Sequence, residues 1–467
     1  MDPSIFKAYD IRGIYPDTLD ADAGRAIGRA LARYLRRGDP GTPGAGVERK
    51  IERTSVVLGR DMRESGIRLR ETLIEGLRAE DVDVIDVGRV SSPMVYFAVN
   101  ALGAHGGVMI TASHNPGQYN GFKICRDRAI PIGIESGLRE IRDLAMSLEA
   151  EPAGPTQLGS LREESIHESY CADLLELLEP RSRHRVVIDA GNGIAGEAIE
   201  PLLPQLPLDI ERLFFEADGS FPNHEADPLK LENLADLQRE VIAQRADLGV
   251  AFDGDGDRAV FVDERGEPIP ADLMTALFVR TLFEQQLFGV ERGSTLVYDL
   301  RSSRVVAEEI RELGGKPQRS RVGHAFIKLA MREGGAIFGG ELSGHYYFRF
   351  PSGYIADDGA AAFLLMLRVL EQADRPLSEL WTPLRRYAQS GEENRRVADT
   401  LAATQRVKEA YADGESDELD GLTVHYEDWW FNLRPSNTEP LLRLNVEAKT
   451  RAEMIRRRDE ILARVEA

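Results

Sequence analysis

Residues 248–262 read LGVAFDGDGDRAVFV and place three aspartates between two apolar runs. The apolar runs are rich in β-branched and aromatic residues, which predicts two strands. Asp253, Asp255 and Asp257 alternate with glycine, so a tight turn can bring all three carboxylates together. Carboxylates held that close repel one another unless a cation joins them. The stretch therefore predicts a strand–loop–strand unit that holds a hard divalent cation, Mg²⁺ or Ca²⁺.

A calcium loop of the EF-hand type is the main alternative for this metal site. Val260 and Glu264 stand at the positions where such a loop has an apolar residue and a bidentate glutamate. Arg258, however, stands at the position where that loop requires glycine. The flanking runs also have a strand pattern and not that of amphipathic helices. A metal loop between strands with an arginine beside it favours phosphate chemistry over calcium sensing.

Composition excludes several classes of protein. The chain has 467 residues, which suggests about three domains. A hydrophobic content of 42% and a charged content of 29% are typical of a globular protein. The net charge of −20 argues against nucleic acid as a partner, since nucleic acid requires a basic face. An anionic substrate must then be held by a local basic cluster.

Cysteine usage and the absence of targeting signals predict a cytoplasmic protein without a membrane partner. Cys125 and Cys171 are the only cysteines, so no disulfide framework exists. Residues 1–7 lack the basic and apolar regions of a signal peptide. The apolar run 360–367 is too short to span a bilayer.

A strand–helix–strand pattern recurs three times along the chain. Each copy begins with an apolar run that ends in a polar turn, at residues 56–61, 186–191 and 296–301. Each copy continues with a second strand, at residues 107–110, 248–252 and 336–338. This alternation predicts three similar α/β domains in which the paired strands are parallel. Ligand loops are then expected at the carboxyl ends of the strands.

The last stretch of the chain has a different pattern. Leu442, Leu444 and Val446 alternate with polar residues, which predicts a half-buried strand. Residues 450–453 match a capping box before a final helix. The expected fold class is thus α/β, with three similar domains of mixed sheets and a smaller α+β C-terminal domain. Breaker-rich stretches set the expected domains at 1–158, 159–266, 267–374 and 375–467.

Two further segments carry groups able to do chemistry. Residues 111–116 read TASHNP and could expose the hydroxyl of Ser113, although the same residues are ordinary turn formers. A serine needs a base, a metal or a pre-attached group to act as a nucleophile. Residues 339–345 read GGELSGH, in which Glu341 and Ser343 alternate as strand residues do and could bind vicinal sugar hydroxyls. A glycine turn whose polar residues face water is the alternative.

Residues 434–439, RPSNTE, have the composition of an anion site. Arg434 offers a planar fork matched to phosphate, and hydroxyls with successive N–H groups can complete an anion nest. Arg443, on the following strand, could reach the same anion. The alternative is a capped turn. The sequence contains no P-loop, HExxH or CxxC motif.

Taken in order, these segments resemble the α-D-phosphohexomutase superfamily, and within it the bacterial phosphomannomutase/phosphoglucomutase proteins. The resemblance spans nearly the whole chain and runs through residues 7–13, 59–61, 111–116, 119–123, 253–258, 340–345 and 434–440. It implies a four-domain, heart-shaped α/β protein around a central cleft. The four domains then carry, in order, a phosphoserine loop, a metal loop, a sugar loop and a phosphate loop.

The resemblance also implies a role for each site residue. Ser113 carries a phosphoryl group, and one oxygen of that group joins the three aspartates as a ligand of Mg²⁺. Sugar and phosphate binding are implied for Glu341, Ser343, Arg434, Ser436, Asn437, Thr438 and Arg443. Arg258 would neutralise phosphate. The candidates for proton transfer and charge stabilisation are Lys123, His324, His345 and Arg12, and Lys123 is favoured.

The implied reaction is a reversible phosphoryl transfer between the 1- and 6-positions of mannose or glucose phosphates. It proceeds through phosphoserine and a hexose 1,6-bisphosphate, which also serves as activator. A phosphoglucosamine mutase, a catalytically silent sugar-phosphate binding protein and a metal-dependent phosphatase remain alternatives. The expected partners are small hexose phosphates, and the expected state is a monomer or weak dimer. Residues 91–93 read SSP where the family usually has Thr-Pro, a difference expected to be unimportant.

Overall fold

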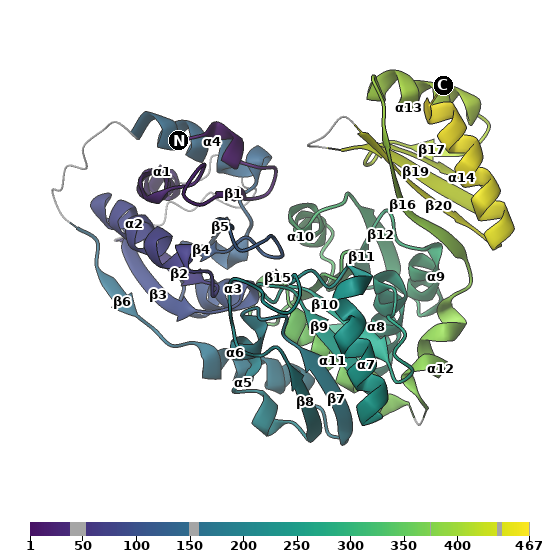
Figure 1. The fold of residues 1–467 in the computed structure, drawn as a ribbon, viewed down its shortest axis with the longest axis horizontal. Coiled ribbons are helices and arrows are strands. Elements are labelled where there is room, and N and C mark those ends of the chain that lie inside the picture. The colour runs from purple at the N-terminus through teal and green to yellow at the C-terminus, as the bar shows by residue number, and fades with distance from the viewer. Residues whose placement is uncertain (38–52, 149–157, 374, 437–440, 467) are drawn as a thin grey trace. The chain divides into compact units, whose positions relative to one another are not determined.

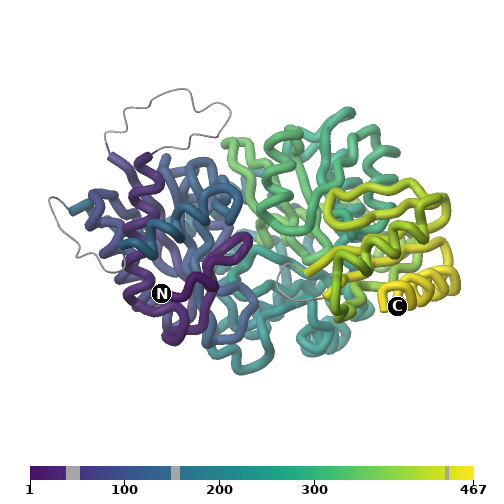
Figure 2. Tube along the Cα trace, turned by 90° about the horizontal axis from the view of Figure 1, so that it is seen from above, coloured from purple at the N-terminus to yellow at the C-terminus, as the bar shows by residue number. Residues whose placement is uncertain are grey.

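The computed structural model describes residues 1–37, 53–148, 158–373, 375–436 and 441–466. Helices and strands alternate along most of the chain (Figures 1 and 2). The chain forms two compact units. The first unit comprises Met1–Ile269 and Ser343–Leu377, and the second comprises Pro270–Leu342 and Ser378–Ala467.

A six-stranded mixed sheet forms the N-terminal part of the first unit. Its order is β1 (Ile11–Ile14), β5 (Tyr119–Arg126), β4 (Gly106–Ile110), β2 (Ser55–Arg60), β3 (Asp83–Arg89) and β6 (Leu161–Glu163). The helices are α1 (Ala21–Arg37), α2 (Ser65–Ala79), α3 (Ser92–Ala101) and α4 (Arg139–Leu148). Alternate residues of β2 and β4 pack in one core with α1, α2 and α4, whereas α3 contacts the same two strands through Gly59 and Gly107. The sheet is therefore covered by helices on both faces, and its polar loops are left at the strand ends.

A four-stranded sheet follows in the same unit. Its order is β10 (Ala259–Asp263), β9 (Leu248–Phe252), β7 (His184–Asp189) and β8 (Leu208–Leu213). The helices near it are α5 (His167–Leu178), α6 (Ala195–Ile199) and α7 (Ala235–Gln244). The hairpin β14 (Tyr346–Arg349) and β15 (Ile355–Asp357) also belongs to this unit, together with α11 (Gly359–Gln372). Because α11 packs on α5 and β10, this late segment of the chain joins the first unit.

The second unit combines a parallel sheet with an antiparallel one. In the parallel part, β11 (Thr295–Asp299) lies between β12 (Lys316–Ser320) and β13 (Phe338–Gly340). The helices are α8 (Ala271–Gln285), α9 (Arg304–Glu312) and α10 (His324–Glu333). The antiparallel sheet has the order β16 (Ala388–Arg396), β20 (Leu441–Ala448), β19 (Trp429–Pro435), β18 (Leu422–His425) and β17 (Glu415–Asp417). The remaining helices are α12 (Leu377–Trp381), α13 (Thr400–Ala410) and α14 (Arg451–Glu466).

The repeated strand pairs predicted from sequence are confirmed as parallel pairs. They are β2 with β4, β7 with β9, and β11 with β13. The α+β class of the C-terminal part is also confirmed, and Thr450 caps α14 by accepting the N–H of Glu453 at 3.2 Å. In the described part of the chain, no helix is both long and apolar enough to cross a membrane.

The half-buried pattern predicted for β20 is wrong, because almost all of this strand is buried. The polar Asn445 and Glu447 lie inside along with the leucines. The reason is that the Glu447 carboxylate accepts hydrogen bonds from Trp430 Nε1 at 2.8 Å and from the backbone N–H of Arg304 at 3.2 Å. Glu447 thereby caps the N-terminus of α9, so the second face of β20 is covered.

Candidate active site

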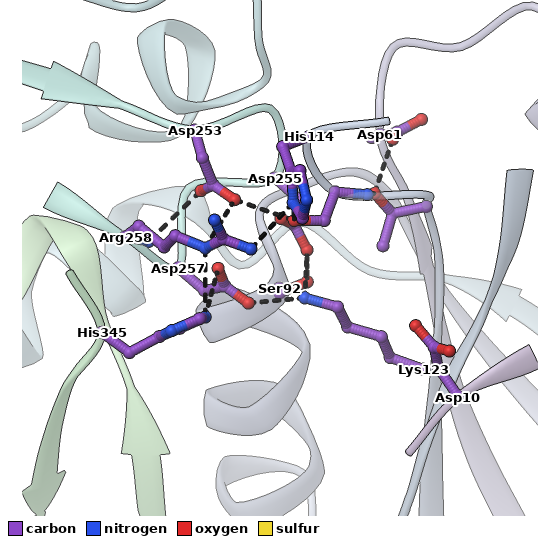
Figure 3. Close-up of polar contacts among 12 residues, drawn as sticks. Asp10, Asp61, Ser92, His114, Lys123, Asp253, Asp255, Asp257, Arg258 and His345 are labelled. Atoms are coloured by element: carbon purple, nitrogen blue, oxygen red, sulfur yellow. Dashed lines mark hydrogen bonds and ion pairs between the residues drawn. The ribbon is translucent and has the colours of Figure 1, made fainter. Parts of the chain in front are cut away.

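The loop between β9 and β10 brings three carboxylates together (Figure 3). Asp253, Asp255 and Asp257 can each offer an oxygen to a common point, because these atoms lie within 4.8 Å of one another. Gly256 adopts φ of +75°, a conformation open to glycine, which tightens the turn. Asp253 and Asp255 are 0% exposed, so the loop is not a solvated acidic turn.

The donor set fits a hard divalent cation. All three groups are carboxylates, the ligands that Mg²⁺ and Ca²⁺ prefer. Asp255 Oδ1 is buried and has no hydrogen-bond partner among the described residues, so it has a free ligand position. Burial, followed by the charges of Asp257 and Asp255, raises the pKa of Asp253 well above its usual range. Asp253 therefore lacks compensating positive charge, which a bound cation would supply.

Lys123 of β5 lies against the same carboxylates. Its Nζ is 2.6 Å from Asp255 Oδ2 and 2.5 Å from Asp257 Oδ2. Burial opposes the charge of this amine, but Asp255 and Asp257 outweigh burial and raise the pKa of Lys123 well above its usual range. Lys123 is therefore an ammonium group that donates hydrogen bonds to both carboxylates.

Ser113 follows β4 and reaches the acidic loop. Its Oγ donates to Asp253 Oδ2 at 2.9 Å. The sequence predicted an exposed hydroxyl, but Ser113 is only 2% exposed. The cause is the close approach of Gly254, where a Cβ atom would lie 2.4 Å from the Ser113 carbonyl oxygen. The loop that contains Ser113 (residues 111–119, called the serine loop) and the loop that contains the three aspartates (residues 253–258) thus form one packed centre.

His114 belongs to this centre and is absent from the residues predicted on sequence. Its Nδ1 accepts from Arg258 at 2.8 Å and lies 3.2 Å from Ser113 Oγ. Since arginine can only donate, Nδ1 must be the acceptor nitrogen. Burial, followed by the charges of Arg258 and Arg12, lowers the pKa of His114 to about 2. The imidazole is therefore neutral at physiological pH.

The segment 341–345 forms a turn after β13, so the predicted strand-like alternation of Glu341 and Ser343 is wrong. Ser343 Oγ bonds His345 Nδ1 at 2.8 Å, and His345 Nε2 lies 3.3 Å from Asp257 Oδ1. Burial opposes the charge of Asp257, but Lys123, followed by His345, outweighs burial and holds the pKa of Asp257 well below its usual range. His345 is therefore a direct neighbour of the acidic loop.

Arg12 of β1 contacts the serine loop from another side. Its NH1 donates to Asn115 Oδ1 at 2.6 Å, and its NH2 pairs with Asp10. Asn115 lies two residues after Ser113 in the chain. The structure thus brings Arg12, Lys123, Arg258 and His345 to one centre with Ser113 and the three aspartates.

Three arginines form a second cluster, in the second unit. Arg434 of β19 and Arg443 of β20 lie directly opposite each other in the sheet. The Glu392 carboxylate joins them, at 2.5 Å from Arg434 NH2 and 2.9 Å from Arg443 NH1. Arg301 NH1 lies 3.6 Å from the same carboxylate. Burial opposes the charge of Glu392, but Arg434 and Arg301 prevail and lower its pKa.

The other predicted residues of the second unit lie near this arginine cluster or outside the described chain. Glu341 Oε1 accepts the N–H of Gly323 at 3.1 Å and lies 3.6 Å from Arg301 NH2. His324 begins α10, next to Gly323, and its part in proton transfer stays a prediction. Ser436 ends the described part of its loop, where its N–H donates to the Leu441 carbonyl. Asn437 and Thr438 lie outside the described residues.

Sequence reasoning missed Ser92, Arg301 and Glu392 as well as His114. Ser92 Oγ donates to Asp255 Oδ2 and Ser92 N to the Asp255 carbonyl, and a threonine at this position would offer the same hydroxyl and N–H. The turn Asp299-Leu300-Arg301 was noted only as the end of a strand. Glu392 has no local signal, since its partners lie 42 and 51 residues away.

Family models match almost the whole chain. They describe the phosphoglucomutase/phosphomannomutase α/β/α domains I, II and III and the C-terminal domain, which match residues 3–151, 168–266, 270–387 and 392–464.

Individual relatives agree with the family models. A protein named "Phosphohexose mutases" from Xanthomonas campestris is 39% identical over 97% of both chains. A phosphomannomutase from Methanocaldococcus jannaschii is 36% identical over 100% of this chain and 99% of its own. The crystal structure of a phosphoglucomutase/phosphomannomutase family protein from Burkholderia thailandensis superposes with a TM-score of 0.88. It is 33% identical and covers 100% of this chain and 97% of its own. The chain therefore belongs to the phosphoglucomutase/phosphomannomutase family, in the bacterial branch of the α-D-phosphohexomutase superfamily.

Proposed function

We propose that the protein interconverts hexose 1-phosphates and hexose 6-phosphates, with Ser113 as the phosphoryl carrier. The observation that supports Ser113 most directly is its hydroxyl, 2.9 Å from Asp253 within a buried cluster of three aspartates. A phosphoryl group on this oxygen would extend the ligand set of a cation held by the three carboxylates. The names of the relatives support a hexose phosphate as substrate.

We assign Mg²⁺ to the three aspartates, which fit it as an all-oxygen set. When bound, Mg²⁺ would withdraw charge from the transferring phosphoryl group, which favours the loose transition state of phosphoryl transfer. Lys123 and Arg258 add positive charge at the same place, since they contact Asp255, Asp257 and His114.

The proposed reaction has two matching halves. O6 of a hexose 1-phosphate bonds to phosphorus, the bond from phosphorus to Ser113 Oγ breaks, and the O6 proton is transferred to the departing serine oxygen. The resulting 1,6-bisphosphate turns over and returns its 1-phosphoryl group to Ser113 by the reverse steps, leaving hexose 6-phosphate. Lys123 and His345 are the candidates for passing the proton. Hexose 1,6-bisphosphate also activates by phosphorylating free Ser113.

We assign the arginine cluster to the phosphate that is not reacting. Arg434 and Arg443 present planar forks, and both Nε groups are buried without a hydrogen-bond partner among the described residues. A phosphate would satisfy these donors. Glu341 and Ser343 are assigned to sugar hydroxyls, and Ser436, Asn437 and Thr438 to the same phosphate as the arginines.

The domain limits at residues 158, 266 and 374 stay a proposal, with one chemical loop in each domain. The two cysteines are buried and form no disulfide, which suits a reducing compartment such as the cytoplasm.

A product assay tests the proposed function. The protein is incubated with Mg²⁺, a catalytic amount of glucose 1,6-bisphosphate, and mannose, glucose or glucosamine 1-phosphate in separate reactions. We expect the 6-phosphate of mannose or glucose to form, with phosphorylation mapped to Ser113 by mass spectrometry. Inorganic phosphate as the main product would indicate a phosphatase. Binding without turnover would indicate a catalytically silent binding protein. Turnover of glucosamine phosphate alone would indicate a phosphoglucosamine mutase.

A further inference from the structure

The backbone at Ser113 adopts a conformation that its surroundings must impose. Its φ is +51°, in the left-handed region that non-glycine residues rarely occupy. Such residues persist where neighbouring groups over-determine them, and they gather at functional sites. The groups that bind the backbone N–H and carbonyl of Ser113 are therefore the ones that can hold this geometry.

Arg63 supplies most of these contacts. Its guanidinium is 0% exposed and donates to four backbone carbonyls of the serine loop. The acceptors are Ser113 O at 2.9 Å, Asn115 O at 2.6 Å, Pro116 O at 2.8 Å and Tyr119 O at 3.1 Å. The fifth donor, Nε, binds Asp61 Oδ2 at 3.1 Å. Every N–H of the guanidinium is thus used, and four of the five fix the loop.

Asp61 and Thr111 hold the other side of the serine. Thr111 Oγ1 donates to Asp61 Oδ2 at 2.7 Å and accepts the backbone N–H of Ser113 at 2.9 Å. Asp61 Oδ1 in turn accepts the backbone N–H of Arg63 at 2.9 Å. The N–H and the carbonyl of Ser113 are therefore both tied to the Asp61–Arg63 pair, one through Thr111 and one directly.

A second loop, which contains Gly219 and Phe221, shields this network from water. The Phe221 ring centre lies 5.1 Å from the Arg63 guanidinium carbon. A Cβ atom at Gly219 would lie 2.8 Å from Arg63 Cα, so the two backbones touch. Buried, fully satisfied polar networks are rigid, because every alternative arrangement leaves a polar group unpaired.

We propose that Asp61, Arg63 and Thr111 act as positioning residues, which fix the Ser113 backbone so that Oγ meets the metal loop in the geometry of phosphoryl transfer. This inference rests on the proposed role of Ser113. A displacement of about 1 Å of a reacting atom can lower a rate roughly 100-fold, so a loose serine loop would slow transfer without weakening substrate binding.

The test compares matched variants. Thr111→Val keeps the shape but removes the acceptor for the Ser113 N–H, whereas Thr111→Ser keeps the hydroxyl. Arg63→Lys keeps the charge but cannot reach four carbonyls. Arg29→Lys is the control, because Arg29 is a buried arginine of the same region that binds Glu80 and the Leu148 carbonyl. For each protein, one measures the single-turnover rate of transfer from phosphorylated enzyme to glucose 1-phosphate, the KM and the melting temperature.

We expect the transfer rate to fall about tenfold in Thr111→Val and about 100-fold in Arg63→Lys, with KM changed less than twofold. Thr111→Ser and Arg29→Lys should transfer at close to the wild-type rate. A wild-type rate in Thr111→Val would overturn the proposal. An equal loss of transfer rate in Thr111→Ser would also overturn it, and so would a failure of Thr111→Val to fold. Either result would mean that Thr111 contributes packing and does not position Ser113. Mapping of the phosphoryl group separates the two hypotheses: a phosphoryl group absent from Ser113 in active wild-type enzyme rejects the proposed function itself.

Discussion

The two charged centres of this protein have opposite compositions and a common design. Around Ser113, three aspartates surround the Lys123 ammonium, which bridges two of them. In the second unit, three arginines surround the Glu392 carboxylate, which also bridges two of them. In each centre, a residue of opposite charge bridges two groups that would otherwise repel.

The centres differ in how open they are to exchange. The three aspartates are almost fully buried, and Lys123 is too. Glu392 and Arg443 keep 24% and 31% of their side chains exposed, whereas Arg434 and Arg301 keep 9% and 12%. A buried centre suits chemistry that needs fixed positions, whereas a centre that is exposed at one side suits a phosphate that must bind and leave in every cycle. The comparison predicts that changes in the first centre affect kcat and changes in the second affect KM.

Ser113→Ala should have the largest effect. Without the hydroxyl no phosphoryl carrier exists, so we expect turnover to fall by about 10⁴-fold or more. Substrate binding measured by calorimetry should change little, because the arginine cluster is intact. Intact mass after incubation with glucose 1,6-bisphosphate should show no added phosphoryl group. Turnover within tenfold of wild type would mean that another group carries the phosphoryl.

Asp255→Asn should lower kcat by about 100-fold and raise the Mg²⁺ concentration needed for half-maximal rate. The cause is the loss of one metal ligand and of one charge facing Lys123. The measurement is a Mg²⁺ titration of the rate after chelation with EDTA. Asp236→Asn, in the first turn of α7 where Asp236 pairs with Arg239, is the control. An unchanged Mg²⁺ requirement would remove Asp255 from the metal site.

Arg434→Ala should weaken substrate binding by about tenfold, which corresponds to the loss of one charge-assisted hydrogen bond. Phosphorylation of Ser113 should be unchanged, and labelled 1,6-bisphosphate should escape more often during turnover. Steady-state kinetics with release of the labelled intermediate measures both effects. Arg406→Ala, on α13, serves as control because Arg406 donates to the backbone carbonyls of Arg464 and Val465, away from the arginine cluster's Glu392. If KM and release stay at wild-type values, the segment is only a capped turn.

Glu392→Gln should have the smallest effect, and it should strengthen phosphate binding where Arg434→Ala weakens it. Glutamine can still bond to Arg434 and Arg443, but the cluster gains one net positive charge and should bind phosphate about threefold more tightly. The matched control is Glu393→Gln on the same strand, since Glu393 pairs with Arg395 and Arg458 instead. KM measured at two salt concentrations checks the electrostatic cause. A higher KM in Glu392→Gln would show that the carboxylate orients the arginines more than it competes with phosphate.

The metal loop was predictable because the residues that determine its structure are close together in the sequence. The two strands 248–252 and 259–263 and the three aspartates lie within sixteen consecutive residues, and the alternation of aspartate with glycine dictates the turn. The parallel strand pairs were predictable for a similar reason, since each repeat carries its own pattern of strand and helix. The residue types of the metal loop indicated a metal site, and the resemblance to a known family implied the role of each site residue.

The supporting residues could not be predicted, because they act over long separations. Ser92 meets Asp255 across 163 residues, and Arg63 meets the serine loop across about fifty. Nothing in a local pattern distinguishes Arg63 from other arginines. Glu447 shows the same limit in the fold, because β20 alternates like a half-buried strand until α9 covers its polar face. Packing between distant elements decides these roles.

The most direct test of the account follows one phosphoryl group. Enzyme labelled on Ser113 with ³²P from glucose 1,6-bisphosphate is freed of ligand and mixed, with Mg²⁺, with unlabelled mannose or glucose 1-phosphate. The account predicts that label leaves Ser113 in a single turnover and is found first in hexose 1,6-bisphosphate and then at position 6 of hexose 6-phosphate. Label that stays on Ser113 while product forms, or that is released as inorganic phosphate, would contradict the account.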